Sequence, residues 1–478
     1  MSKRLSRPAL LFVCVAGALV GCGPLTGPER PNVMVVVLDT TRADVLSVYG
    51  NSVPTTPRMD ALAREGARFT RAYSTGFWTL PSHASLFTGQ YPSAHGATSE
   101  TNRLPSRAET LAEVLRRAGY RTAAFPSNPW VSAERGFDQG FETFTETWRQ
   151  RPGLPHEDRG GVELVRRFLE GHDPGRPFFL FLNLNTAHMP YVPDEAVLRA
   201  LHGDREPLVD PDRREKLAKL TGLWRHIAGR EVLEDRDFAE LRALYEAEIA
   251  MLDARVGELV DALRDRDLLD ETLVVVTSDH GENIGEHGLI DHMLSMYDTT
   301  TRIPLILRYP PRIEAGRVFE GLTSLVDVAP TILDACGLPA DALPAAGHSL
   351  MALLDGTIAP PPFVVAENER PVNGVELLNR AFPDFDTTQI DRPMRMLRTS
   401  RHKLIRRDGA GVELYDLEND PAEEEDVSDD LPELRERLLS DLEEWQAQYP
   451  QQPGGGGTAT ESADRESLEQ LRALGYIE

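Results

Sequence analysis

Short runs rich in Val, Ile, Leu and Phe recur along the chain, separated by stretches in which apolar residues return every three or four positions. Runs that are apolar throughout are typical of strands buried on both faces, and the intervening spacing is typical of helices. The strand-like runs occupy residues 33–38, 122–125, 178–184, 273–277 and 304–307. The alternation predicts an α/β fold in which a mostly parallel sheet is sandwiched by helices.

The longest helical pattern runs from Phe238 to Leu263, and its apolar positions form one stripe. Shorter helices are predicted over 59–64 and 111–118. After about residue 340 the pattern changes to a loop-rich stretch followed by short β-like runs and a last helix. These runs lie at 394–398, 403–406 and 412–415, and the helix at 431–448. They predict a small C-terminal α+β subdomain with an antiparallel sheet.

The chain is therefore expected to have five segments. They are a signal peptide (1–21), a tether (22–31), a large α/β domain (32–345), a subdomain with a small antiparallel sheet and a helix (346–450), and a linker with a terminal helix (451–478).

The N-terminus has the pattern of a processed signal. Three basic residues precede an apolar run over 9–21, which is too short to span a bilayer as a helix. The run ends in LVGC and resembles a bacterial lipoprotein box, which implies that Cys22 becomes lipid-modified; ordinary secretion with a coincidental Cys22 is the alternative. Residues 23–31 are rich in Gly and Pro and fit a flexible tether.

This signal predicts a lipoprotein of the bacterial cell envelope, anchored to a membrane by its lipid and facing the periplasm or the exterior. Apart from Cys22, the processed chain keeps only Cys336, so no intrachain disulfide is expected. Cys336 lies in an apolar run and is predicted to be a buried thiol.

Composition and charge exclude several classes of protein and one class of binding partner. A content of 41% hydrophobic and 27% charged residues excludes a multi-span membrane protein, a collagen-like fibre and a wholly disordered chain. With 51 basic and 76 acidic residues the net charge is -25, and such a surface repels phosphate backbones. No nucleic acid is expected as a partner, and the sequence indicates no protein partner.

Polar residues follow three of the predicted strands. Asp39 follows the first, His188 lies just after the third, and Asp279 and His280 follow the fourth. Ligands of open α/β sheets bind beyond the carboxyl ends of the strands. Carboxylates and imidazoles gathered at that edge are costly to bury unless they are paired or bind a metal. The pattern predicts a metal or ligand site there.

The segment 77–89 (FWTLPSHASLFTG) enters a helix, whose N-terminus suits a tetrahedral anion. It resembles the sulfatase signature, in which Cys or Ser is followed by any residue, Pro, Ser and Arg before a helix that closes on Thr-Gly. Further segments resemble the family's metal motifs and C-terminal region: VVVLDTTRADVLSVYG, SDHGENIGEHGLIDHMLSMYDTTTRIPLIL, GLTSLVDVAPTILDACGLP and KLIRRDGAGVELYDLENDP. The chain is identified as a member of the sulfatase-like, alkaline-phosphatase-related superfamily, which implies a metal-dependent ester hydrolase.

The chain departs from the family at the nucleophile. Sulfatases convert the signature Cys or Ser to formylglycine, whose hydrate releases sulfate by elimination, whereas Thr79 stands here. A threonine hydroxyl can act as a nucleophile once it is deprotonated and forms a covalent ester that water must break. Threonine at this position resembles related phosphodiesterases and phosphoethanolamine transferases, which favours phosphoryl chemistry.

The implied metal ligands also differ from those of calcium sulfatases, because Thr40 and His280 replace an Asp and an Asn of the family pattern. The expected set is Asp39, Thr79, Asp279 and His280. Its mixture of carboxylate and imidazole favours zinc or manganese over calcium. One divalent ion is expected to be required, and a second has room if His188 and His292 hold it.

The resemblance implies further site residues. His83 replaces the signature Arg, and His188 and His292 take positions that contact the substrate anion or the leaving group; with Thr79 these form the expected catalytic set. Asn128 is expected to line the substrate pocket with His188 and His292.

Three residues outside this set are given structural roles. Glu282 and Asp291 are expected to orient ligands, and Lys403 is expected at the surface.

The predicted activity is cleavage of a phosphate mono- or diester through a Thr79 covalent intermediate, on an anionic ester substrate. The alternatives are hydrolysis of an envelope or extracellular sulfate ester, a phosphoethanolamine-type transferase, and a catalytically inactive binding protein. The transferases carry a membrane-spanning bundle that is absent from this sequence.

Overall fold

The computed structural model describes residues 30–150, 158–203, 207–217, 220–292, 294–388 and 390–452, together with 469 and 472. The predicted signal peptide, Cys22, the tether up to residue 29 and nearly all of the C-terminal linker and helix lie outside the described residues. Within the described part of the chain, no helix combines the length and the apolar character that crossing a bilayer requires.

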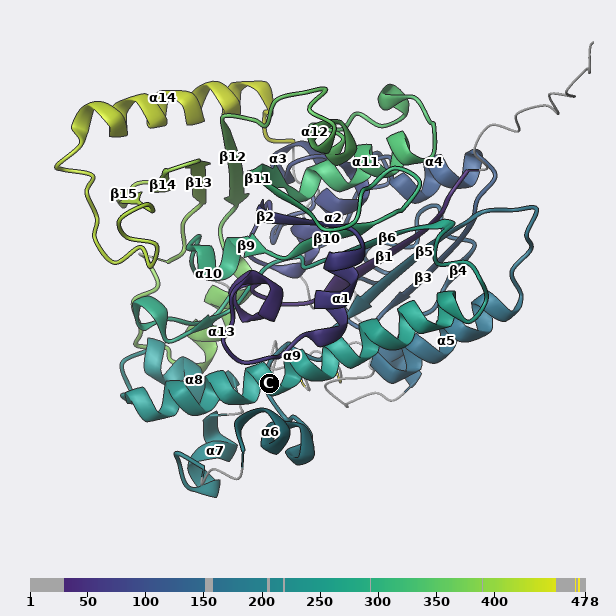
Figure 1. Cartoon of the computed structure of the whole chain (residues 1–478). Coiled ribbons are helices and arrows are strands. Elements are labelled where there is room, and N and C mark those ends of the chain that lie inside the picture. The colour runs from purple at the N-terminus through teal and green to yellow at the C-terminus, as the bar shows by residue number, and fades with distance from the viewer. Residues whose placement is uncertain are drawn as a thin grey trace, which may run out of the picture.

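The core of the molecule is a nine-stranded sheet with the order β11-β2-β10-β6-β1-β5-β3-β4, and β9 pairs with β2 (Figure 1). The strands are β1 (Asn32–Leu38), β2 (Ala67–Tyr73), β3 (Arg121–Pro126), β4 (Thr143–Phe144), β5 (Phe178–Leu184), β6 (Thr272–Thr277), β9 (Arg302–Ile303), β10 (Leu305–Arg308) and β11 (Arg317–Ser324). β1 lies between β5 and β6 and runs parallel to both. The predicted α/β fold with a mostly parallel sheet is confirmed.

Helices cover both faces of this sheet (Figure 1). One layer contains α1 (Pro57–Glu65), α5 (Asp158–Glu170) and the long α9 (Asp235–Arg264). The other contains α2 (Thr79–Thr88), α3 (Pro92–His95), α4 (Leu111–Arg117), α11 (Val328–Ala335) and α12 (Leu350–Leu354). Because helices shield both faces, every residue of β1 is buried, which explains its uninterrupted apolar sequence.

Smaller elements complete the large domain. They are α6 (Glu195–His202), α7 (Pro211–Leu217), α8 (Leu220–Ile227), the two-stranded hairpin β7 (Asn283–Ile284) and β8 (Ile290–Asp291), and α10 (Asp298–Thr301). The hairpin follows β6 and carries residues of the candidate site.

The C-terminal region forms an antiparallel sheet with the order β12-β13-β14-β15. Its elements are β12 (Phe363–Asn368), α13 (Val372–Ala381), β13 (Met394–Thr399), β14 (His402–Arg407), β15 (Gly411–Asp416) and α14 (Pro432–Gln448). Leu404 of β14 packs with Leu442 and Trp445 of α14 in a separate apolar cluster. The three strands predicted in this region are present, and β12 adds a fourth.

The large sheet is mostly and not uniformly parallel, as predicted, because β10 is antiparallel to both β2 and β6. β2 and β11 were not predicted, because charged residues interrupt their apolar sequences at positions that the structure leaves partly or fully exposed. Cys336 is a buried free thiol, as predicted.

Candidate active site

Polar side chains from neighbouring strands meet at the carboxyl edge of the sheet. β1 leads into Asp39, β6 into Asp279 and His280, and β3 into Asn128. The four side chains are at most 1% exposed. The parallel order of β6, β1, β5 and β3 therefore brings residues that are distant in sequence into one buried cluster.

Asp39 is held from one side. Its Oδ2 accepts hydrogen bonds from Nδ2 of Asn128 and from Nδ2 of Asn183, each at 2.9 Å. Its Oδ1 accepts no hydrogen bond from the described residues. The two amides fix the carboxylate so that one oxygen is left for another ligand.

Asp279 is arranged in the same way. Its Oδ1 accepts from the backbone N–H of His280 at 2.9 Å and of Thr40 at 3.2 Å. Its Oδ2 accepts no hydrogen bond from the described part of the chain and lies 3.3 Å from His280 Nε2. Each aspartate thus turns one oxygen toward the imidazole.

His280 presents Nε2 to these carboxylates. Its Nδ1 lies 3.0 Å from the carbonyl oxygen of Gly281, which can only accept, so Nδ1 carries the proton. In the neutral ring, Nε2 then has a free lone pair, as a metal ligand requires. Nε2 also lies 3.9 Å from Asp39 Oδ1.

Thr79 begins α2 and faces this cluster. Its Oγ1 lies 3.4 Å from His280 Nε2 and 3.4 Å from Asn128 Nδ2. The hydroxyl is therefore within reach of the same point on which the two aspartates and the imidazole converge.

The donor set fits a divalent cation. One ligand atom each from Asp39, Asp279 and His280 lies within 4.8 Å of the others, and all three residues are buried. Two buried carboxylate oxygens without hydrogen bonds are costly unless a cation offsets their charge. The combination of two carboxylates and one imidazole suits zinc or manganese.

The two carboxyl groups influence each other electrostatically. Burial, reinforced by the neighbouring Asp279 carboxylate, raises the pKa of Asp39 above its usual value. Burial also acts on Asp279, but the adjacent His280 outweighs it and holds the pKa of that carboxyl below its usual value.

His83 lies next to Asp279. Its Nδ1 is 2.9 Å from the carbonyl oxygen of Thr79 and 3.4 Å from Asp279 Oδ2. Its ring packs edge-on against Phe137 and Phe181, and burial lowers its pKa. Its hydrogen bond to Thr79 is therefore to the backbone carbonyl and not to the hydroxyl.

Glu282, Asp291 and His292 form a second buried group beside the first. His292 Nδ1 lies 2.9 Å from Asp291 Oδ1 and 3.5 Å from Glu282 Oε1. Burial opposes charge on the His292 ring, but the two carboxylates outweigh it and hold the pKa of His292 well above its usual value. The centroid of the His292 ring is 4.5 Å from that of His280, so the two groups adjoin.

His188 also adjoins His292. The two ring centroids are 5.4 Å apart, and His188 Nδ1 is 2.6 Å from the carbonyl oxygen of Met189. The structure therefore brings together Thr79, His188, His280 and His292, and His83 contacts this cluster through Asp279 Oδ2.

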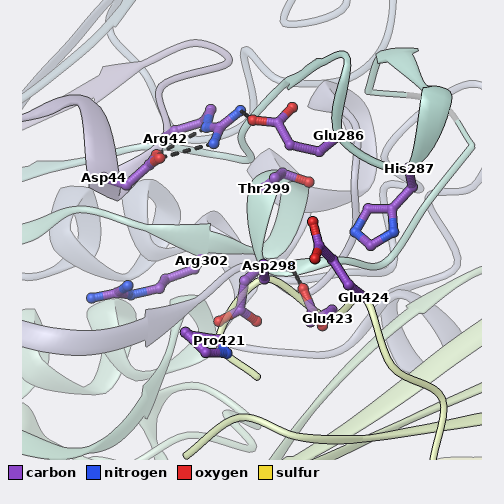
Figure 2. Close-up of a pocket in the computed structure, with 11 residues that line it drawn as sticks. Arg42, Asp44, Glu286, His287, Asp298, Thr299, Arg302, Pro421, Glu423 and Glu424 are labelled. Atoms are coloured by element: carbon purple, nitrogen blue, oxygen red, sulfur yellow. Dashed lines mark hydrogen bonds and ion pairs between the residues drawn. The ribbon is translucent and has the colours of Figure 1, made fainter. Parts of the chain in front are cut away.

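Two residues that position the site were missed in the sequence. Asn183 is the one polar residue of the strand FFLFLNL, and an amide in a fully buried strand is a signal of a hydrogen-bonding role. Arg42 donates to Asp44 and Glu286 and to the carbonyl oxygen of Glu282 at 3.1 Å. Figure 2 shows this guanidinium at the wall of a cavity of about 330 Å³ next to the hairpin.

Solved structures match this fold closely. A phosphonate monoester hydrolase of Agrobacterium radiobacter superposes with a TM-score of 0.71 at 24% identity, covering 88% of this chain and 96% of the other. A protein solved with its substrate D-glucosamine-2-N,6-O-disulfate gives a TM-score of 0.72 at 23% identity, covering 88% of this chain and 98% of the other.

Sequence comparisons agree with the fold. The N-acetylglucosamine-6-O-sulfatase of Bacteroides thetaiotaomicron is 26% identical, over 93% of this chain and 92% of that protein. Human arylsulfatase K is 27% identical, over 89% and 85% respectively. The N-sulphoglucosamine sulphohydrolase C-terminal model matches residues 285–448, and the Sulfatase model matches residues 31–338. Because the latter match spans well over half of the chain, this protein belongs to the sulfatase family of ester hydrolases.

Proposed function

We propose that this hydrolase cleaves phosphate mono- or diesters, with Thr79 as the nucleophile. The observation that carries the proposal is the position of Thr79 Oγ1, 3.4 Å from His280 Nε2. Two aspartate oxygens without hydrogen bonds from the described residues face the same point.

In this proposal Asp39, Asp279, His280 and Thr79 Oγ1 hold one zinc or manganese ion. When bound, such an ion lowers the pKa of a coordinated hydroxyl and offsets negative charge on the ester oxygens. The protein contributes the geometry: Asn128 and Asn183 orient Asp39, and the start of α2 fixes Thr79.

The proposed reaction has two displacements at phosphorus. Thr79 Oγ1 loses its proton and forms the Oγ1–P bond, while the P–O bond to the leaving alcohol breaks and that oxygen gains a proton. Water then attacks phosphorus, the Oγ1–P bond breaks, and Thr79 regains its proton. A threonine ester has no elimination route like that of formylglycine, so attack by water is needed, and this supports a phosphate rather than a sulfate ester.

We assign the substrate anion to the side of the cluster occupied by His188, His292 and Asn128. The ring of His292 adjoins those of His188 and His280, at centroid distances of 5.4 and 4.5 Å. His83 positions Asp279 through its 3.4 Å contact.

A second candidate function is hydrolysis of a sulfate ester. It is favoured by the relatives named as N-acetylglucosamine-6-O-sulfatase and arylsulfatase K. The phosphonate monoester hydrolase with the same fold favours the phosphoryl alternative.

A matched set of aryl phosphate, phosphodiester, phosphonate and sulfate esters tests the two functions. With zinc or manganese present, we expect turnover of a phosphate ester. We expect Thr79→Ala to abolish it while metal binding stays largely intact, because three of the four proposed ligands remain. Mass spectrometry of a quenched reaction should find a phosphoryl group on Thr79. Turnover of the aryl sulfate alone would establish the second function, and equal inactivity of both proteins on all four esters would indicate a binding protein.

We also propose that the mature protein is anchored to the bacterial cell envelope through a lipid on Cys22, facing the periplasm or the exterior. The LVGC sequence after the apolar run supports this. Labelling with a radioactive fatty acid should mark the wild type and leave Cys22→Ser unlabelled; equal labelling would refute the anchor.

A further inference from the structure

The group formed by Glu282, Asp291 and His292 has the composition of a metal site. One ligand atom from each residue lies within 4.8 Å of the others, and the three side chains are at most 4% exposed. Two carboxylates and one imidazole are the same donor types as in the neighbouring group of Asp39, Asp279 and His280.

Glu282 is the residue that the protein alone leaves unsatisfied. It is fully buried, and neither of its carboxylate oxygens accepts a hydrogen bond from the described residues. Its Oε1 lies 3.5 Å from His292 Nδ1, a distance too long for a good hydrogen bond. A buried carboxylate without hydrogen bonds is costly, and a bound cation would remove that cost.

Asp291 is held in an unusual conformation for this position. Its φ is 73°, in the left-handed region that residues other than glycine rarely adopt. Its Oδ2 accepts from Trp224 Nε1 at 3.0 Å, and its carbonyl oxygen accepts from Asn283 Nδ2 at 2.5 Å. Backbone strain of this kind persists where the surrounding structure enforces it, commonly at functional sites.

Hydrogen bonds from Arg42 also hold the hairpin that carries these ligands. Arg42 donates to the carbonyl oxygen of Glu282 and to the carboxylate of Glu286, as Figure 2 shows for the latter pair. The backbone of Glu282 is therefore positioned independently of its side chain, which leaves the carboxylate available to a ligand.

We propose that Glu282, Asp291 and His292 bind a second divalent transition-metal ion, zinc or manganese, next to the first. The ring centroids of His280 and His292 are 4.5 Å apart, so the two proposed sites adjoin. The inference rests on the proposed function for the first ion, and it assigns Glu282 and Asp291 a direct role as ligands. An ion here would offset negative charge on the substrate.

Metal content tests the proposal without any measurement of activity. The full chain is stripped of metal with a chelator, reloaded with excess Zn²⁺ or Mn²⁺ and freed of unbound metal. Elemental mass spectrometry then gives the number of ions bound per chain. We expect two ions per chain in the wild type and one in Glu282→Gln. Glu248→Gln is the matched control. Glu248 lies in α9 and is another buried carboxylate, which accepts a hydrogen bond from the backbone N–H of Val192. This variant should keep two ions per chain.

The outcomes separate the two sites. One ion per wild-type chain at saturating metal overturns the second site, whatever the variants do. If that ion is lost in Asp279→Asn and kept in Glu282→Gln, the proposed first site survives alone. If it is kept in Asp279→Asn and lost in Glu282→Gln, the first site fails. Melting curves of each variant check that the fold is retained, and His292→Gln, expected to hold one ion, replaces Glu282→Gln if that variant does not fold.

Discussion

The hydrogen bond from Asn183 to Asp39 makes a quantitative prediction. Asn183 Nδ2 donates to Asp39 Oδ2 at 2.9 Å, and its Oδ1 accepts from the backbone N–H of Asn128 at 3.0 Å. In Asn183→Leu both bonds are lost, while Asn128 still donates to Asp39. Among the described residues, the Asn183 side chain makes no hydrogen bond to Thr79, so the substitution removes no hydrogen bond of the proposed nucleophile.

A hydrogen bond to a charged group contributes about 1.5–3 kcal/mol. Because a second donor remains, we expect a loss near the lower end of this range. At about 1.4 kcal/mol per factor of ten, a loss of about 1.5 kcal/mol corresponds to about tenfold weaker binding of the first ion. Titration of the metal-free protein with Zn²⁺ against a fluorescent chelator measures the change.

Asn32→Leu is the matched control. Asn32 is also a buried strand amide, and its Oδ1 accepts from the N–H of Phe178 at 3.0 Å, at the opposite end of β5. Each variant leaves a backbone N–H unpaired, so both should be destabilised, by about 1–3 kcal/mol. Only Asn183→Leu should weaken metal binding. Equal affinities in Asn183→Leu and the wild type, or an equal loss in both variants, would refute the assignment of Asp39 as a ligand oriented by Asn183.

Two further predictions concern stability. Burial raises the pKa of Glu248 to about 8, so the protonated carboxyl contributes fully to stability below pH 4.5, and this contribution is lost as the pH rises through about 8. Between pH 5 and 8.5 the melting temperature should therefore fall less steeply in Glu248→Gln than in the wild type. Parallel curves for the two proteins would contradict this. Lys403 Nζ lies 2.8 Å from Asp298 and 2.8 Å from Glu423, so Lys403→Met leaves the buried Glu423 and the partly buried Asp298 without their cation and should cost about 3–5 kcal/mol in urea unfolding. Adding Glu423→Gln should restore part of that loss, and an unchanged urea midpoint in Lys403→Met would show that the ion pairs contribute nothing.

The sequence predicted the parts of the site that follow directly from strand ends. Asp39, Asp279 and His280 each follow an apolar strand, so their meeting at one edge could be inferred from the parallel arrangement alone. Thr79 required the resemblance to the signature, because a threonine at a helix start is usually a capping residue.

The sequence could not show contacts made across the fold. Lys403 was expected at the surface, and this was wrong: it is fully buried because Asp298, which is 105 positions away, and Glu423 pair with it. β2 was missed for a similar reason, since its partners β10 and β11 lie far along the chain and a local pattern does not reveal them.

The separation of the ligands along the chain has a consequence for how the protein matures. Asp39 follows β1, whereas His280 follows β6, and register places these two strands side by side. Of the ligands proposed for the first ion, the amino-terminal half carries Asp39 and Thr79, whereas Asp279 and His280 are translated later. With these ligands, stable capture of the ion would await translation of β6 and closure of the sheet, so that loading with metal would report completed folding.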